Sequence, residues 1–356
     1  MAALPEERLL KKVDTMLKID KSKVEFLVTA GMVQEVKNIL ATELPKIKEI
    51  VESVLHRGKL ERVYFVACGS PLSAAETAKQ LFDQYSSIPC TAYSGWDFCD
   101  NTPKKLDEKC LVIAISHYGK TEEVIEALQL AKNHGASTVG VTNKLENPLA
   151  TVGDFVIDYH AECIWEAHLL ISYAFALGII STLEPNQEVD AIYSQLYELP
   201  AVLEKLVTGY EEIGRKLGEK ASKWPFIYSI AGGILRPLAY KEGIVTLLEF
   251  TWTHGSALNS AEFRHGPLEI VEPGVPFVFL LGTDASRHTT ERALNFVKRY
   301  DSEIITLDYA ELGEGLHPML APMVLFVPLE WFCYYLAIYK DHNPDDRRYY
   351  GGLVEY

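Results

Sequence analysis

The sequence predicts an α/β protein built of two similar, doubly wound halves. Short apolar, β-branched segments alternate with helix-length amphipathic segments from Arg62 onward, and the same order returns in the second half of the chain. Parallel strands need crossover connections, and helices between the strands supply them. The chain has 356 residues, of which 48% are hydrophobic, so it can bury a core in each half. The pattern therefore favours two parallel sheets, each covered by helices.

The first half contains five segments with the composition of buried strands. In order they are RVYFVACGS (62–70), TAYSGWDF (91–98), CLVIAI (110–115), STVGVTN (137–143) and DFVIDYH (154–160). The apolar run that follows, Leu169–Leu183, is shorter than the roughly 20 residues that a membrane span needs. We expect this run to form a buried helix.

The second half repeats the order in pattern, although not in identity. WPFIYSIAGG (224–233) precedes a long helical segment, and VPFVFLLG (275–282) and EIITLDYAE (303–311) follow as strands. The segment 323–340, MVLFVPLEWFCYYLAIYK, is expected to contain the fifth strand and an aromatic-rich helix after it. In both halves the third strand ends in a polar turn that opens a helix, SHYGKTEEVIEAL in the first and GTDASRHTTERAL in the second. We infer an internal duplication.

The polar, helix-prone stretch 184–223 lies between the halves and is expected to be a connecting helix. The domain organisation that we predict has three parts. A helical lead-in occupies residues 1–45, the first lobe residues 46–205 and the second lobe residues 206–356.

Charge and cysteine content narrow the classes of partner. The formal net charge of -15 repels phosphate backbones and anionic lipid, so we expect neither nucleic acid nor a membrane surface as partner. An anionic ligand must then be held locally. The six cysteines contain no C-x-x-C pair, and the N-terminal residues lack the apolar core of a signal peptide. This pattern favours reduced thiols and a cytoplasmic location.

Two turns of the first half are candidates for holding a phosphate. Gly69 and Ser70 follow the first strand, and Ser116 and Thr121 bracket the turn after the third. Glycine allows close backbone approach, hydroxyls donate hydrogen bonds, and helix N-termini attract anions. The alternative is that these hydroxyls only cap helices. Lys120 and His117, in the second turn, can each be read as a ligand contact or as a structural residue.

The segment from Tyr240 to Val271 carries the candidate proton-transfer groups. Glu242 and Glu249 are seven residues apart, which would place them on one helix face. Glu249 has apolar neighbours, so it is either exposed on a polar stripe or desolvated with a raised pKa. His265 precedes a Gly-Pro turn and could titrate near neutrality or be structural.

Together these motifs resemble the SIS (sugar isomerase) family. CGS, S-x-x-G-K-T, KEG-x5-EF and EFRHGP match it over most of the chain, doubled as in the isomerase half of glucosamine-6-phosphate synthase. The resemblance implies two tandem SIS lobes, each a three-layer αβα sandwich with a mainly parallel five-stranded sheet. It implies a homodimer or larger homo-oligomer whose sites are shared between subunits. It assigns Glu249 and His265 as the catalytic pair, and a sugar phosphate to Gly69, Ser70, Ser116, Tyr118 and Thr121.

A finer match resembles one branch of this family, which acts on phosphorylated Amadori compounds such as fructoselysine 6-phosphate. It rests on WTHG, EFRHGPLEIVEPGVPF, RHTTERA and the tail KDHNPDDRRYYGGLVEY. The expected activity is a deglycase that uses water to release glucose 6-phosphate and a free amine, through an enaminol and an aldimine. We expect no cofactor and no metal, since no histidines show paired zinc-ligand spacing. The alternatives are an aldose-ketose phosphosugar isomerase and a non-catalytic sugar-phosphate sensor.

Four positions depart from the synthase pattern. This chain has Pro71 and Tyr118 where the synthase has serines, and Thr246 where it has a helix lysine. No lysine follows Lys340, whereas the synthase uses a lysine in its tail. Ring opening must therefore be assigned to other groups, and simple hexose-phosphate isomerisation is less favoured.

Overall fold

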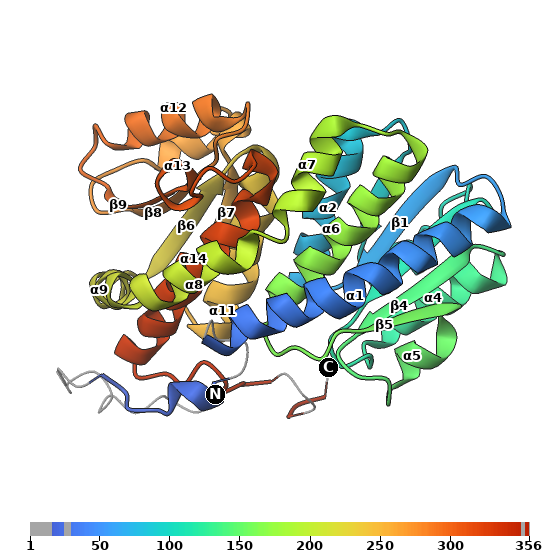
Figure 1. The fold of residues 1–356 in the computed structure, drawn as a ribbon. Coiled ribbons are helices and arrows are strands. Elements are labelled where there is room, and N and C mark those ends of the chain that lie inside the picture. Colours follow the sequence, from blue (N-terminus) through green and yellow to red (C-terminus); the bar gives the residue numbers. More distant parts are fainter. Residues whose placement is uncertain (1–15, 25–29, 350–352, 356) are drawn as a thin grey trace.

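The computed structural model describes residues 16–24, 30–349 and 353–355, and Figure 1 shows two lobes side by side. The first lobe is built on a five-stranded parallel sheet of order β2-β1-β3-β4-β5. Its strands are β1 (Arg62–Ala67), β2 (Cys90–Tyr93), β3 (Cys110–Ile115), β4 (Ser137–Thr142) and β5 (Phe155–Asp158). Four of the five strands lie within the segments predicted from the sequence, and β2 begins one residue before its segment.

Helices cover both faces of this sheet because successive strand residues point to opposite sides. Phe65 and Ile113 face α1 (Ala30–Arg57), α2 (Ser70–Tyr85) and α6 (Ile164–Leu183) in one buried cluster. Tyr64 and Val112 belong to a second cluster, with α3 (Gly95–Asp100), α4 (Glu122–Asn133) and α5 (Pro148–Val152). Strands buried on both faces read as near-continuous hydrophobic runs, which is why the sequence showed them clearly.

The stretch between the lobes is helical, as predicted, but it forms three helices. They are α7 (Gln187–Gln195), α8 (Leu199–Gly209) and α9 (Glu211–Ala221). Asn186 caps the start of α7 by accepting a hydrogen bond from the Glu188 backbone N–H at 2.8 Å. The predicted lead-in over 1–45 lies partly outside the described residues; α1 begins at Ala30 and continues to Arg57.

The second lobe has a four-stranded parallel sheet of order β7-β6-β8-β9, so the prediction of five strands is wrong there. Its strands are β6 (Phe226–Ala231), β7 (His254–Asn259), β8 (Pro276–Leu281) and β9 (Glu303–Asp308). The expected fifth strand, at the start of 323–340, is part of the helix α14 (Ala321–Tyr339). Conversely, β7 lies in a segment that was not predicted as a strand.

Packing explains the misassigned strand. A short apolar run has the same composition in a buried strand and in a fully buried helix, so periodicity does not separate them. Every residue of α14 from Ala321 to Ile338 is buried. The segments Ile164–Leu183 and Pro318–Tyr339 are each long and apolar enough to cross a membrane, but 83% and 100% of their apolar windows are buried inside the protein. The prediction of a buried helix at Leu169–Leu183 is confirmed.

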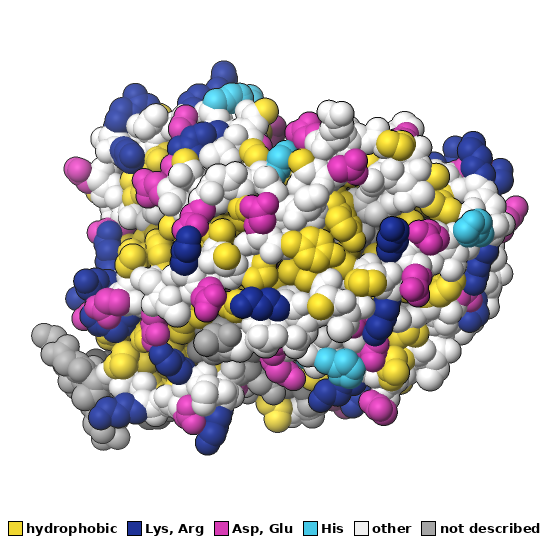
Figure 2. All heavy atoms as spheres, in the orientation of Figure 1, with side chains coloured by type: hydrophobic (Ala, Val, Ile, Leu, Met, Phe, Trp, Pro, Cys, Tyr) yellow, Lys and Arg dark blue, Asp and Glu magenta, His cyan; other side chains and the backbone are white. Residues whose placement is uncertain are grey.

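Helices also cover both faces of the second sheet, and one core continues between the lobes. One face is covered by α10 (Arg236–Tyr240), a π-helical turn (Lys241–Thr246), α11 (Leu247–Phe250) and α14. The other face is covered by α12 (Arg287–Val297). The short helix α13 (Tyr309–Leu312) follows β9. The largest buried cluster contains residues from both sheets together with α6 and α14. Figure 2 shows hydrophobic side chains gathered across the middle of one face, with acidic and basic side chains interspersed around them.

Candidate active site

The two predicted phosphate turns lie next to each other at the carboxyl edge of the first sheet. β1 and β3 are neighbours, and their last residues, Ala67 and Ile115, are paired. The side chain of Cys68, in the first turn, donates a hydrogen bond to Glu123 of α4 at 3.4 Å. The carboxyl ends of parallel strands are where ligands bind in open α/β sheets. The strand order therefore brings Gly69 and Ser70 close to the turn after β3.

The hydroxyls of Ser116 and Thr121 contact each other within the second turn. Their oxygens are 2.8 Å apart, and Ser116 is buried. Thr121 precedes α4 at its N-cap, but its side chain makes no capping hydrogen bond. Gly69 holds the corresponding position before α2, with a φ of 64°, so no side chain caps that helix either. For Thr121 the alternative interpretation, a simple helix cap, is therefore wrong.

Glycine is required inside the second turn. Gly119 has a φ of 62°, and a Cβ there would lie 1.8 Å from the side-chain oxygen of Asn147. Asn147 in turn caps α5 and donates a hydrogen bond to Thr142 at 3.0 Å. The turn is thus held against the end of β4. The glycine of the S-H-Y-G-K-T motif is needed for the backbone conformation of the turn, and the hydroxyls of the motif can bind a ligand.

The other side chains of this turn differ in exposure. Tyr118 is 52% exposed, and Lys120 is exposed. His117 is buried, and its Nδ1 lies 2.7 Å from the Tyr159 hydroxyl, which also lies 2.7 Å from Nε2 of His168. Burial, and to a smaller extent Lys144, lowers the pKa of His117 to about 4. His117 is therefore neutral near pH 7 and belongs to a buried structural network.

We expect Ser116→Ala and Thr121→Val each to raise KM for a phosphorylated sugar. Each change removes a hydroxyl that can bond a charged oxygen, an interaction that contributes about 1.5 to 3 kcal/mol. Steady-state kinetics of purified variants measures the effect. Ser53→Ala is a matched control, because Ser53 is an exposed residue whose hydroxyl donates to the Glu49 carbonyl of α1 at 2.8 Å. An unchanged KM in both turn variants would place the phosphate elsewhere.

Glu242 and Glu249 do not share a helix face, so that prediction is wrong. Residues 241–246 form a π-helical turn, in which a seven-residue spacing no longer returns to the same side. Glu242 is 1% exposed and accepts a hydrogen bond from the Cys333 thiol at 2.5 Å. Glu249 lies one turn beyond the π-helical segment, with a side chain that is 35% exposed.

The π-helical turn carries a buried cluster of charges between the lobes. Lys241 forms a buried ion pair with Glu330 of α14, and its ammonium lies 4.6 Å from the ring centre of Phe326. Burial raises the pKa of Glu242 to about 7, because the ionised form loses its hydration there. Since π-helical turns are frequent at functional sites, this one marks the segment that leads to Glu249.

Glu249 is paired with the C-terminal tail. The Nε of Arg347 donates a hydrogen bond to its carboxylate at 2.9 Å. Lys340, at the end of α14, donates to Thr253 at 2.7 Å. The tail therefore closes over the segment between α11 and β7. Sequence reasoning missed Arg347, although the double arginine in the quoted tail was a signal that a cation follows Lys340.

Glu249 and His265 lie on either side of β7 in the same chain. Glu249 precedes β7 and His265 follows it, and the six residues of β7 extend over about 16 Å at the usual rise per residue. His265 is exposed and lies in a turn. Its backbone N–H donates a hydrogen bond to the Glu262 carbonyl at 2.8 Å, and Gly266 follows with a φ of 124°. One chain thus presents the two predicted catalytic groups at opposite ends of one strand.

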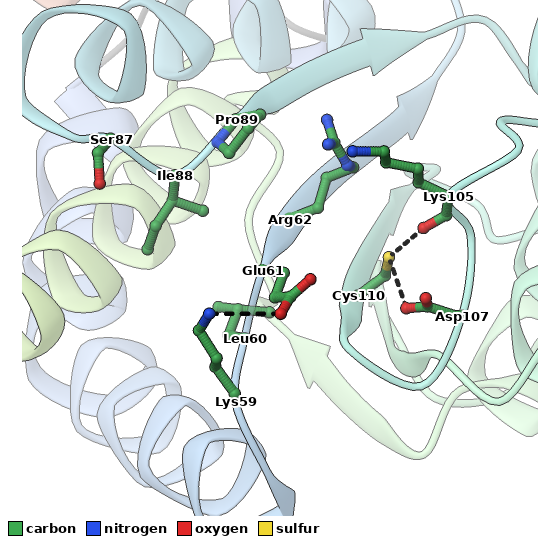
Figure 3. Close-up of a pocket in the computed structure, with 10 residues that line it drawn as sticks. All are labelled: Lys59, Leu60, Glu61, Arg62, Ser87, Ile88, Pro89, Lys105, Asp107 and Cys110. Carbon is green, nitrogen blue, oxygen red and sulfur yellow. Dashed lines mark hydrogen bonds and ion pairs between the residues drawn. The ribbon is translucent and has the colours of Figure 1, made fainter.

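A cavity of about 520 Å³ lies at the other edge of the first sheet, by the amino ends of β1 and β3. Figure 3 shows Arg62, Lys105 and Asp107 at its wall, with the Cys110 thiol donating to the Lys105 carbonyl at 3.0 Å. Ligands of parallel sheets bind at the carboxyl ends of strands. This cavity is therefore separate from the candidate active site.

The comparisons with known proteins agree with this geometry. The family model for the SIS domain matches residues 58–200, which contain the whole first sheet. The fructoselysine 6-phosphate deglycase of Escherichia coli (strain K12) is 60% identical over 341 residues, covering 96% of this chain and 100% of the relative. The fructosamine deglycase of Bacillus subtilis (strain 168) is 33% identical, over 85% of this chain and 96% of the relative.

The fold is also similar to solved structures. A Bacillus subtilis structure named a phosphosugar isomerase superposes with a TM-score of 0.80 at 33% sequence identity, covering 89% of this chain and 100% of that one. Two parallel sheets, the predicted phosphate turns after β1 and β3, and a match with curated relatives over 96% of this chain all agree. The chain therefore belongs to the SIS-domain phosphosugar isomerase family.

Proposed function

We propose that this protein is a fructoselysine 6-phosphate deglycase, which hydrolyses its substrate to glucose 6-phosphate and lysine. The observation that carries the proposal is the 60% identity with the Escherichia coli enzyme of that name over the full length of that relative. The paired hydroxyls of Ser116 and Thr121 support it, because they offer hydrogen bonds to a phosphate. Free thiols at all six cysteines are compatible with a reducing, cytoplasmic location, which we also propose.

In the proposed mechanism Glu249 is the base. It removes a proton from C1 of the open-chain ketose, and the C2 carbonyl receives the electron pair, giving an enaminol. Return of a proton to C2 then forms the aldimine between C1 and the amine nitrogen. Water adds to C1, the C–N bond breaks, and lysine and glucose 6-phosphate leave. The NH of Arg347 at 2.9 Å holds the carboxylate of Glu249 in place.

His265 moves protons at the C2 oxygen in this proposal. Because Glu249 and His265 lie at opposite ends of β7 in one chain, we propose that they come from different subunits of a homodimer. The resulting sites are composite: each subunit supplies Gly69, Ser70, Ser116, Tyr118, Thr121 and Glu249 to its own site, and His265 to the site of its partner.

The first test is a product assay. We expect purified protein to convert fructoselysine 6-phosphate into equal amounts of glucose 6-phosphate and lysine, without added metal or nucleotide. Coupled glucose-6-phosphate dehydrogenase and amino-acid analysis measure the two products. Fructoselysine without the phosphate is the control substrate, and we expect it to react far more slowly, because the hydroxyls of the two turns have no anion to bind.

The alternative activity, aldose-ketose isomerisation, has the same enolising step but no amine that leaves. The similar Bacillus subtilis structure is named a phosphosugar isomerase. Conversion between hexose phosphates with no release of lysine would favour this alternative. Absence of any turnover would favour the sugar-phosphate sensor.

A further inference from the structure

A second cavity borders Glu249 on the side of the C-terminal tail. Its volume is about 320 Å³. It is lined by Leu248, Glu249, Trp252, Thr253, His254, Arg347, Arg348 and Tyr349. Glu249 is the proposed base, so a group bound here is a direct neighbour of the carbon that reacts. The sugar phosphate has its own binding groups at the turns after β1 and β3, which leaves the purpose of this cavity open.

The charged lining of the cavity favours an anion. It holds two arginines and one carboxylate, and that carboxylate, Glu249, is paired with Arg347 at 2.9 Å. Arg348 forms no ion pair with a carboxylate in the part of the chain that the structure describes. An arginine at a cavity wall with no carboxylate partner among the described residues is notable in a protein whose formal net charge is -15.

Stacking holds the guanidinium of Arg348 in place. Its central carbon lies 3.9 Å from the ring centre of Trp252. The imidazole ring of His342 is also stacked on Trp252, and the centres of these two rings are 3.8 Å apart. Burial lowers the pKa of His342 to about 4, so this ring is neutral near pH 7 and does not repel the arginine. Stacking occupies the face of a guanidinium and leaves its N–H groups, which lie in its plane, able to bind a carboxylate.

We propose that this cavity binds the leaving-amine half of the substrate, with Arg348 recognising the α-carboxylate of an amino acid. The inference rests on the proposed function and extends it to the choice of amine. In fructoselysine 6-phosphate the sugar is joined to the side-chain nitrogen, so the carboxylate lies at the far end of an aliphatic chain. Leu248, which is exposed, supplies apolar surface for that chain, and Arg348 supplies the cation at its end.

The experiment compares two substrates that differ only in this carboxylate. The first is fructoselysine 6-phosphate and the second is the corresponding conjugate of cadaverine, which is lysine without its carboxylate. A charge-assisted hydrogen bond predicts that wild-type kcat/KM is about 10- to 100-fold higher for the first. In Arg348→Met this ratio should fall to nearly one, and Arg348→Lys should retain part of it.

A matched control and a folding check accompany these variants. Arg299 is another exposed arginine stacked on an aromatic ring, 4.7 Å from the centre of Phe296, and Arg299→Met should keep the wild-type ratio. Thermal melting of each variant verifies that it is folded. Because the ratio compares two substrates on one protein, a partial loss of active enzyme cancels from it.

The possible outcomes separate the two proposals. Equal wild-type kcat/KM for both conjugates, or an Arg348→Met variant that keeps the full ratio, would overturn the carboxylate subsite. A variant that slows both conjugates to the same extent would also overturn it, because Arg348 would then act on the shared sugar phosphate or on the fold. If wild type releases no glucose 6-phosphate from either conjugate, the proposed function fails, and the subsite fails with it.

Discussion

Replacing Glu249 with glutamine is expected to lower kcat by about 100- to 10,000-fold, the usual contribution of a positioned general base, with little change in KM. The amide cannot accept the C1 proton, but its oxygen can still accept the hydrogen bond from Arg347 that the carboxylate accepts at 2.9 Å. The variant should therefore keep the geometry of the site and lose the ability to remove the C1 proton. Single-turnover measurement of glucose 6-phosphate formation, with substrate affinity measured separately by calorimetry, tests both halves of the expectation.

Two further carboxylates serve as comparisons for this prediction. Glu272→Gln alters an exposed residue in the loop before β8 and should leave kcat and KM unchanged. Glu242 is the rival base, but it is 1% exposed and bonded to the Cys333 thiol at 2.5 Å, so substrate cannot reach it without movement of the core. If Glu249→Gln stays active while Glu242→Gln loses turnover in a folded protein, the base is Glu242.

Mixing two inactive variants is expected to restore about a quarter of wild-type activity. One variant is Glu249→Gln and the other is His265→Ala, mixed under conditions that allow subunits to exchange. Random exchange makes about half of the dimers mixed. In each mixed dimer one composite site carries both substitutions and the other carries neither. The expectation follows from β7, a strand about 16 Å long that lies between Glu249 and His265 in one chain.

The control mixture pairs Glu249→Gln with a chain that carries Glu249→Gln and a purification tag, and it should recover no activity. In the test mixture the His265→Ala chain carries the same tag. In both mixtures, co-purification of the untagged Glu249→Gln chain with the tagged chain verifies that subunits have exchanged. If both residues act within one chain, every site keeps one defect and activity stays at the level of the separate variants. Verified exchange with no recovery of activity would therefore refute the shared site. The catalytic roles of Glu249 and His265 would still be tested by the activities of the two single variants.

The sequence by itself determined the first lobe and the family. Its three inner strands, β1, β3 and β4, are buried on both faces and appear as apolar runs between helices, and the edge strands β2 and β5 were also found although they are only partly buried. The motifs around Ser116 and His265 are local in sequence, and a local motif remains readable without the fold. The buried helix predicted at 169–183 was also found, as part of α6, because its apolar run is too long for a strand.

Only the tertiary structure decided the second lobe and the surroundings of Glu249. Whether the start of 323–340 is strand or helix depends on what surrounds it, and in the structure it belongs to α14, which is buried on all sides. With the π-helical turn at 241–246, Glu242 is buried in the core and Glu249 lies beside the C-terminal tail. The pairing of Glu249 with Arg347 joins residues 98 positions apart. Contacts over such separations follow from how helices pack on a sheet, and local composition does not encode them.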